Sequence, residues 1–338
     1  MNPATDKLVS VAVIGAGAFG RNHARIYQQL ALQGEPVRLV GVVDPDVSRA
    51  DAIAGEFGCR AFGSIEQLTT THSEIQAASV AVPTVRHLEV ARALMEAGID
   101  VLVEKPLASS LADADELIGL AQKLGRIAQV GHLERFNPAV RATAELITQP
   151  MFFEVHRLSI FTPRSLDVDV ILDLMIHDLD VVLSFVKSPV KEIRAVGLPI
   201  LSGKTDIANV RMEFESGCVA NFTASRVSTE RVRKIRFFQP RQYVSLDYSR
   251  QDVLVFSVGE SAAAGTPSVN PQIKVAKPPI VVEEPLQAEL RAFLHAVQMR
   301  SKPLVSLEDG RRALAVALDV VAAIREHGQK VQLDQLHR

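Results

Sequence analysis

The sequence has few cysteines and no excess of charge of either sign. Only Cys59 and Cys218 occur among its 338 residues, far apart and without the spacing of metal ligands. This usage favours a reducing cytoplasm and two buried, inert thiols over a disulfide framework. The formal net charge is −2, with acids and bases interspersed, so we expect no basic surface that binds nucleic acid or an anionic membrane.

Long hydrophobic runs are absent as well. No stretch reaches the ~18 uninterrupted apolar residues that a bilayer-spanning helix needs, and aspartates and a histidine interrupt the most apolar helical stretch, 168–186. The N-terminus, MNPATDK, lacks the basic-then-apolar layout of a signal peptide. We therefore expect a cytosolic globular protein, long enough for two domains.

A glycine-rich turn is the first strong motif, in VAVIGAGAFG at residues 11–20. A short apolar strand leads into Gly15, Gly17 and Gly20, which follow the G-x-G-x-x-G pattern, and helical sequence comes next. Gly15 permits a tight turn, Gly17 lets the backbone approach a pyrophosphate, and Gly20 lets the helix pack on its strand. The N–H groups at the helix N-terminus would then face the anion. Alone, the pattern also fits a plain strand–helix connection.

An acid at the end of the second strand strengthens this interpretation. The apolar stretch 39–43 ends in Asp44, near the spacing of about 20 residues expected for a carboxylate on the adenosine ribose. Pro45 follows, where an enzyme that selects a 2′-phosphate would profit from a basic side chain. The sequence thus favours NAD over NADP.

Apolar strands and amphipathic helices alternate from Val9 to about Val130, which is typical of a parallel sheet covered on both faces. We predict an α/β fold whose first domain, residues 1–130, is a doubly wound Rossmann domain that binds a dinucleotide. The expected strands are 9–14, 38–43, 59–62, 77–82, 101–103 and 127–130. The expected helices after the glycine turn are 48–57, 64–70, 87–97 and 110–124.

The pattern changes after about Asn137, where several strands follow one another. We predict a second domain, residues 131–338, of the α+β type, with a large open, mostly antiparallel sheet, helices on one face, and last helices that pack back on the first domain. Expected helices are 141–147, 168–186, 286–299 and 307–328, with a flexible loop at 259–269. Expected strands are 152–161, 192–196, 207–214, 218–225, 234–238, 242–247 and 253–258. Apolar residues on the other sheet face suggest self-association, as a dimer or a tetramer.

Candidate ligand-binding residues fall at the carboxyl ends of the parallel strands, where ligands of such sheets bind. They are the glycine turn, Asp44, Pro83, and the charged pair Glu104–Lys105 before Pro106. The alternative for the pair is a solvated loop that carries an ordinary lysine.

A second candidate site lies in DVDVILDLMIHDLD. Asp173 and His177 are four residues apart, so both side chains would lie on one helical face, with Asp180 three residues further on. A histidine oriented by a carboxylate suits a general base near neutral pH. A core histidine and a metal site are the alternatives. The metal is least favoured because no second histidine or cysteine cluster accompanies the three residues, so we predict none.

These motifs resemble those of a known family. GAGAFG, Asp44, VAVP, VEKP, GHLERFNP and DLMIHDLD occur in the order found in the glucose–fructose oxidoreductase / inositol dehydrogenase / rhizopine catabolism family (Gfo/Idh/MocA). The resemblance covers essentially the whole chain, and the pair E-K-P and D-x-x-x-H is its most specific part. It implies an NAD(P)-dependent dehydrogenase acting on CH–OH groups.

The resemblance also implies residue roles. Lys105 would lie by the nicotinamide ribose and the substrate hydroxyl, His177 would be the general acid/base, and Asp173 would orient it or bind a neighbouring hydroxyl. A secondary alcohol of a sugar would lose its proton to His177 and a hydride to the nicotinamide. The implied cofactor-binding residues are Gly15, Gly17, Ala18, Phe19, Gly20, Asp44, Pro83, Glu104 and Lys105.

GHLERFNPAV and DLMIHDLD resemble more closely the branch that oxidises the 3-hydroxyl of UDP-N-acetylglucosamine, which feeds an aminotransferase. Arg135, Asn137 and Arg164 then become candidates for substrate contacts, together with Lys105, Asp173 and His177. Arg135 fits a structural ion pair equally well. The alternatives are a dehydrogenase of free sugars, inositols or sugar phosphates, a non-catalytic NAD-binding sensor or regulatory subunit, and a metal-dependent hydrolase.

Overall fold

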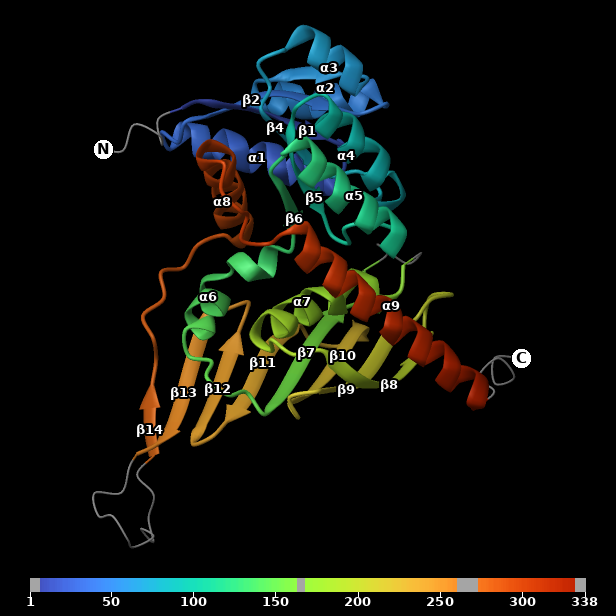
Figure 1. Ribbon diagram of the computed structural model, residues 1–338, viewed down its shortest axis with the longest axis vertical. Coiled ribbons are helices and arrows are strands. Elements are labelled where there is room, and N and C mark those ends of the chain that lie inside the picture. The colour runs from blue at the N-terminus through green and yellow to red at the C-terminus, as the bar shows by residue number, and fades with distance from the viewer. Residues whose placement is uncertain (1–6, 163–167, 260–272, 332–338) are drawn as a thin grey trace, which may run out of the picture. The chain divides into compact units, whose positions relative to one another are not determined.

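The chain forms two compact units, each built around its own sheet (Figure 1). The computed structural model describes residues 7–162, 168–259 and 273–331. The first unit contains residues 1–136 and 284–314, and the second contains residues 137–283 and 315–338. A six-stranded parallel sheet and an eight-stranded, mostly antiparallel sheet confirm the predicted α/β fold class.

The sheet of the first unit has the strand order β3-β2-β1-β4-β5-β6, and all neighbours pair in parallel. This is the order of doubly wound dinucleotide-binding folds, whose ligands bind where the order reverses, here between β1 and β4. Every residue of β1 is buried, as a strand covered on both faces requires. The strands are β1 (Val9–Ile14), β2 (Val37–Val43), β3 (Arg60–Phe62), β4 (Ala77–Val80), β5 (Asp100–Glu104) and β6 (Ala128–Gly131).

Local capping explains where the helices of this unit begin and end. The side chains of Asp46, Ser64 and Ser110 each accept the backbone N–H three residues on, at the first turns of α2, α3 and α5. Gly58 and Gly125 follow α2 and α5 in the left-handed conformation. The helices are α1 (Ala18–Leu32), α2 (Val47–Phe57), α3 (Ile65–Thr71), α4 (His87–Glu96) and α5 (Leu111–Leu124), with the 3-10 turns η1 (Thr84–Arg86) and η2 (Leu133–Phe136).

Helix α8 (Pro285–Met299) belongs to the first unit although it follows the second in the sequence. Phe293 and Val297 share a buried core with Ile26 and Leu30 of α1. Helix α9 (Leu307–Lys330) begins just after Ser306, which bridges to Gln129 of β6. Among the described helices, none has the length and apolarity that crossing a membrane requires.

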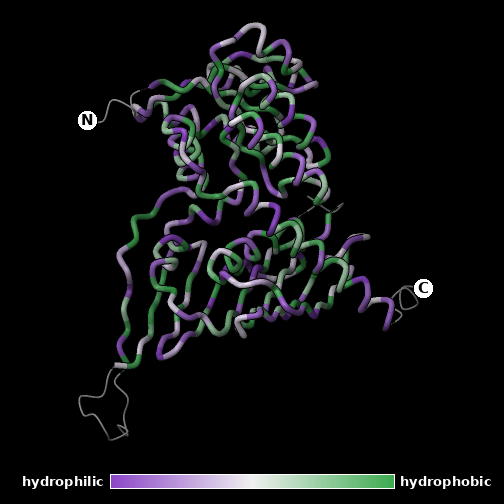
Figure 2. Tube along the Cα trace, in the orientation of Figure 1, coloured by the Kyte–Doolittle hydropathy of each residue, from purple (hydrophilic) through white to green (hydrophobic). Residues whose placement is uncertain are grey.

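The sheet of the second unit has the order β14-β13-β12-β11-β7-β10-β9-β8, and its described strands pair antiparallel except for β7 and β10. Hydrophobic and hydrophilic residues alternate along these strands (Figure 2), because one face is buried under helices α6 (Pro138–Ala144) and α7 (Ile176–Phe185). The strands are β7 (Phe152–Ile160), β8 (Val190–Leu198), β9 (Ile207–Phe214), β10 (Val219–Ser228), β11 (Val232–Gln239), β12 (Gln242–Asp247), β13 (Asp252–Val258) and β14 (Ile273–Ala276).

Some boundaries differ from the prediction. Helix α6 begins at Pro138 rather than 141, because the side chain of Asn137 accepts the N–H of Ala139 and caps the helix one turn earlier. The edge strand β14 was not predicted. The predicted flexible loop 259–269 lies outside the described residues except for Gly259.

The two cysteines are free thiols in separate surroundings. Cys218 is buried, whereas Cys59 is half-buried. Burial raises the pKa of each thiol to about 11. Both thiols therefore stay protonated near neutral pH, and the prediction that both are buried is confirmed for Cys218 but wrong for Cys59.

Candidate active site

The glycine turn joins β1 to α1 in a conformation that needs glycine. Gly15 has a φ of +103°, and a Cβ there would lie 2.5 Å from the carbonyl oxygen of Ala81. A Cβ on Gly20 would overlap the carbonyl of Gly15. At Gly17, a Cβ would meet nothing within 4 Å, so open space adjoins the backbone there. The turn therefore leaves room for a ligand beside the N-terminus of α1.

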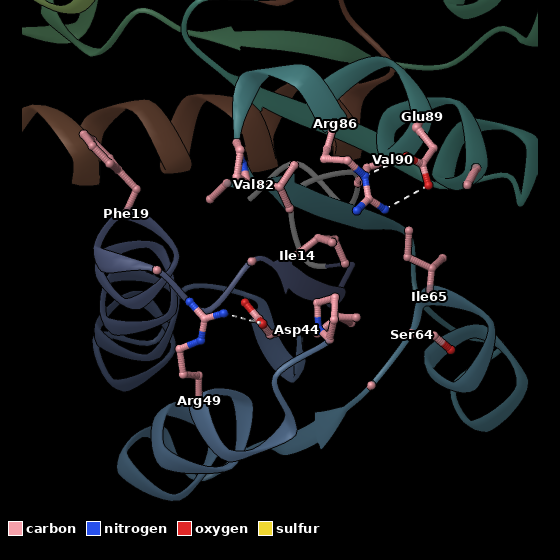
Figure 3. A pocket seen from close by; sticks show the side chains of 18 of the residues that line it. Ile14, Phe19, Asp44, Arg49, Ser64, Ile65, Val82, Arg86, Glu89 and Val90 are labelled. Carbon is pink, nitrogen blue, oxygen red and sulfur yellow. Dashed lines mark hydrogen bonds and ion pairs between the residues drawn. The ribbon is translucent and has the colours of Figure 1, made fainter. Parts of the chain in front are cut away.

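A cavity of about 650 Å³ opens at this turn, at the carboxyl ends of β1, β2 and β4 (Figure 3). Its volume lies within the range of roughly 300–1,000 Å³ typical of small-molecule sites. Six predicted cofactor-binding residues line it: Gly15, Gly17, Ala18, Phe19, Asp44 and Pro83. Gly20, Glu104 and Lys105 are not among the residues that line it.

Asp44 ties the end of β2 to the glycine turn. One of its carboxylate oxygens accepts the N–H of Ala16 at 2.8 Å, and the other accepts the N–H of Asp46 at 2.9 Å. The residue is only 7 % exposed but lines the cavity. Because an ionised carboxylate offers about four acceptor sites, capacity remains for the hydroxyls of a ribose. Asp44 therefore presents hydrogen-bond acceptors to the cavity.

Two arginines that line the cavity, Arg49 and Arg86, were not predicted from the sequence. Figure 3 shows each of them beside a carboxylate. Arg49 of α2 lies 3.4 Å from an oxygen of Asp44 and 2.9 Å from Asp46. Arg86 donates to Glu89 at 2.6 and 2.9 Å. The spacing Arg86–Glu89, one helical turn, was the signal available for that pair. Arg49 follows Asp46 at the same three-residue spacing, so the same signal was available for that pair.

The Glu104–Lys105 segment follows β5. The carboxylate of Glu104 is buried, lies 2.9 Å from Nε2 of His23 in α1, and accepts the N–H of Lys105 at 3.3 Å. Burial opposes ionisation of Glu104, but the hydrogen bond with His23, together with the charge and the N–H of Lys105, outweighs it and lowers the pKa of this carboxyl. His23 was also missed, since its contact spans 81 residues of sequence.

The sequence predicted Asp173 and His177 on one regular helix, and this is wrong for the first turn. Residues Ile171–Met175 form a π-helix, and α7 begins at Ile176. Asp173 is half-buried in the π turn, and His177 is 9 % exposed at the start of α7. Inserted π turns are frequent at functional sites because they re-aim side chains along a helix.

A buried ion pair fixes the same helix. Arg157 of β7 donates to both carboxylate oxygens of Asp178, at 2.6 and 2.9 Å, and the two side chains are 3 % and 2 % exposed. The guanidinium also lies over the ring of Tyr248, 5.1 Å from its centroid. Asp178 follows His177 directly, so the pair holds the histidine's backbone against the sheet.

The remaining predicted substrate residues lie in three different settings. Asn137 is buried, and its amide donates to the carbonyl of Tyr248 at 3.1 Å while it caps α6. Arg135 is half-buried in η2, and its N–H donates to the carbonyl of His132. Arg164 lies outside the described residues. Across the residues that the structure describes, no group of three or more histidine, cysteine, aspartate or glutamate side chains is arranged to hold a metal.

Comparison with known proteins decides the family. Residues 9–132 match a family model described as an oxidoreductase family with an NAD-binding Rossmann fold, and residues 147–241 match the GFO/IDH/MocA C-terminal domain. The chain belongs to the Gfo/Idh/MocA family. It is therefore an enzyme of the NAD(P)-dependent dehydrogenase class, and its Rossmann unit binds a nicotinamide dinucleotide.

Within the Gfo/Idh/MocA family, one relative is similar over nearly its whole length. The chain is 37 % identical to UDP-N-acetylglucosamine 3-dehydrogenase of Acidithiobacillus ferrooxidans, covering 94 % of this chain and 98 % of that protein. A solved structure of that enzyme has a TM-score of 0.84, with 94 % and 98 % coverage. The scyllo-inositol 2-dehydrogenase (NAD(+)) of Bacillus subtilis is 28 % identical, covering 65 % of this chain and 68 % of that protein.

Proposed function

We propose that this protein is an NAD-dependent dehydrogenase that oxidises the 3-hydroxyl of UDP-N-acetylglucosamine. The observation that carries the proposal is the near-full-length similarity to a dehydrogenase of that nucleotide sugar. Support comes from both units, since one has a cavity suited to a dinucleotide and the other has the Asp173/His177 pair.

The proposed mechanism assigns a separate task to each group. The glycine turn and the N-terminus of α1 bind the pyrophosphate, and Asp44 accepts hydrogen bonds from the adenosine ribose. Bound NAD supplies the acceptor for the hydride. His177 takes the proton from the substrate hydroxyl, Asp173 orients the imidazole or binds a neighbouring hydroxyl, and the Lys105 ammonium stabilises the developing negative charge.

The proposed preference for NAD over NADP rests on charge. The Asp44 carboxylate faces the cavity where a 2′-phosphate would lie, and two anions there would repel each other. Arg49 offers the opposite charge, but it already lies beside Asp44 and Asp46. Asp44 remains the group that decides the preference.

Two partners belong to the proposal. A 3-oxo sugar nucleotide is a substrate for an aminotransferase, which would act next.

A second copy of this chain would cover the open face of the eight-stranded sheet. On that face Phe152, Phe238, Tyr243 and Phe256 stack across four strands, with neighbouring ring centroids 4.9–5.7 Å apart. Phe238 is 38 % exposed. We expect Phe238→Lys to lower the mass measured by light scattering, whereas an unchanged mass would place the contact elsewhere.

The test of the function is NADH formation with NAD and a panel of sugars. The panel contains UDP-N-acetylglucosamine, other UDP-sugars, free sugars, sugar phosphates and inositols, with glutamate and an aminotransferase then added to draw off the product. Turnover restricted to UDP-N-acetylglucosamine supports the proposal. Turnover with free polyols alone would favour the second candidate, which the likeness to an inositol dehydrogenase supports.

The same assay tests the alternative of a non-catalytic NAD-binding sensor or regulatory subunit. Such a protein would bind NADH, measured by its fluorescence, and would turn over no member of the panel. The presence of Lys105, Asp173 and His177 argues against this reading, because a binder has no use for an acid/base set. Undiminished activity in the presence of a chelator would eliminate a metal-dependent hydrolase.

A further inference from the structure

Three buried polar side chains lie behind the strand end that carries Lys105. His23, His87 and Glu104 are 0 %, 1 % and 6 % exposed, and none of them lines the dinucleotide cavity. Buried polar groups cost free energy unless they are paired, so such a cluster calls for a reason.

Nε2 of His23 lies 2.9 Å from the Glu104 carboxylate. Within the described part of the chain, its Nδ1 has no hydrogen-bond partner. The tautomer with its proton on Nε2 satisfies this arrangement, since a second proton on Nδ1 would be a buried donor without an acceptor. The ring thus donates to Glu104 and leaves the carboxylate its negative charge.

The surroundings of Glu104 are shaped for that carboxylate. Gly131 lies opposite it on β6, and a Cβ there would come within 3.0 Å of the carboxyl carbon, so a larger residue would displace the group. His87 lies beside the same segment, with its ring nitrogens 3.0 Å from the carbonyl oxygens of Val82 and Pro106. The second carboxylate oxygen of Glu104 accepts the N–H of Lys105.

We propose that His23 is a positioning residue that acts through Glu104 on Lys105. It fixes the Glu104 carboxylate in one orientation, and that carboxylate holds the backbone of Lys105 and balances the charge of its ammonium group. The inference rests on the proposed function in so far as Lys105 is the group that meets the substrate. His23 itself touches neither substrate nor cofactor in this role.

Removing the His23 donor has a defined electrostatic consequence. The titratable groups that act on Glu104 are His23 from α1, His87 from α4 and Lys105 next along the chain. Without the hydrogen bond from His23, burial dominates, and the Glu104 carboxyl takes up a proton nearer neutral pH. Lys105 then loses the negative charge of Glu104 beside it, so activity should fall most steeply as the pH is lowered.

The test uses variants of the full chain matched in size and position. His23→Leu removes the donor, whereas His23→Gln places an amide N–H near the site of Nε2. Tyr27→Phe is the control, because Tyr27 lies one turn further along α1, is fully buried, and loses a comparable hydrogen bond to Ser79 at 2.8 Å. Three properties are measured against pH: kcat and KM with NAD and substrate, NADH affinity, and the infrared carbonyl band of a protonated carboxyl group, assigned by combination with Glu104→Gln.

We expect His23→Leu to lower kcat about 10–100-fold at neutral pH, the loss appropriate to one hydrogen bond to a charged group. It should also show a carboxyl band that titrates near neutral pH and weaker NADH binding where that band is present. His23→Gln should restore most of the activity and remove the band, and Tyr27→Phe should show neither effect.

The inference would be overturned if His23→Leu folds, has the pH profile of the wild type and shows no band of a protonated carboxyl group. Equal loss of activity in His23→Gln and His23→Leu would also overturn it. If His23→Leu does not fold, His23→Gln is compared with His23→Asn, whose amide is one methylene shorter, and equal profiles would reject the inference. The infrared band needs no substrate. Failure of every sugar in the wild-type protein would therefore count against the proposed function and leave the role of His23 to be decided separately.

Discussion

The dinucleotide cavity and the helix of Asp173 and His177 are built by opposite means. The cavity is made of backbone: glycines without a Cβ, the start of α1, and a carboxylate that accepts two backbone N–H groups. The helix depends on buried side-chain charge, with Arg157 and Asp178 2 % to 3 % exposed. The ion pairs at the rim of the cavity are exposed, so water can replace a lost partner there. The buried Arg157–Asp178 pair has no water that could do so.

The largest effect is expected at His177. His177→Ala should lower kcat by about 10²–10⁴, as loss of a general base does, while NADH affinity stays within a few-fold because the dinucleotide cavity lies in the other unit. Steady-state kinetics measures kcat, and NADH fluorescence measures the affinity for NADH. Equal losses of turnover and NADH affinity would show that His177 is a structural residue.

Arg157 tests the buried pair. Arg157→Met should lower the free energy of unfolding by about 3–5 kcal/mol, because it leaves the Asp178 carboxylate buried without its partner. Arg86→Met, in an exposed pair whose side chains are 49 % and 67 % exposed, should cost less than about 1 kcal/mol.

Chemical denaturation measures both Arg157→Met and Arg86→Met. Adding Asp178→Leu to Arg157→Met should recover much of the loss, since an apolar pair replaces the charged one. Similar values for the buried and exposed pairs would remove the distinction between the two regions.

Asp206 gives the second unit a dependence on acid. Burial opposes its ionisation, but the hydroxyl of Ser202 and three backbone N–H groups outweigh it and lower the pKa of Asp206 to about 2 from an ordinary value of 3.8. A carboxyl group whose pKa is lower in the folded than in the unfolded chain stabilises the fold at pH values above its unfolded pKa. This contribution disappears as the pH falls through the pKa of the folded state. Between pH ~5 and ~2, the wild type should lose about 2 kcal/mol more than Asp206→Asn. Parallel pH curves for the two proteins would contradict this assignment.

The same contrast explains what could be predicted from the sequence. Strand β1, the glycine turn and Asp44 depend on local patterns, and the predicted strand 9–14 has the observed bounds. The contacts His23–Glu104 and Arg157–Asp178 join residues 81 and 21 positions apart, and no periodicity links them. The π turn at Ile171–Met175 was missed for a related reason, since a helical pattern does not reveal a turn with one extra residue.

Asp44 gives the smallest of these effects and the finest test of the cavity. Asp44→Asn keeps an oxygen that can accept the N–H of Ala16 but removes the charge, and we expect NAD to bind about tenfold more weakly, as loss of ~1.4 kcal/mol from a charge-assisted hydrogen bond implies. NADP should lose less affinity or gain it, since the repulsion of a 2′-phosphate disappears and Arg49 remains.

Asp46→Asn is the matched control, because it removes the same charge from the same arginine, two residues on, and keeps the oxygen that caps α2. Calorimetric titration with both dinucleotides compares the two variants. If Asp44→Asn alone weakens NAD, the carboxylate acts by contact with the ribose. If both variants weaken NAD binding equally, NAD affinity depends on the total charge at the end of β2, and the ribose contact assigned to Asp44 is wrong.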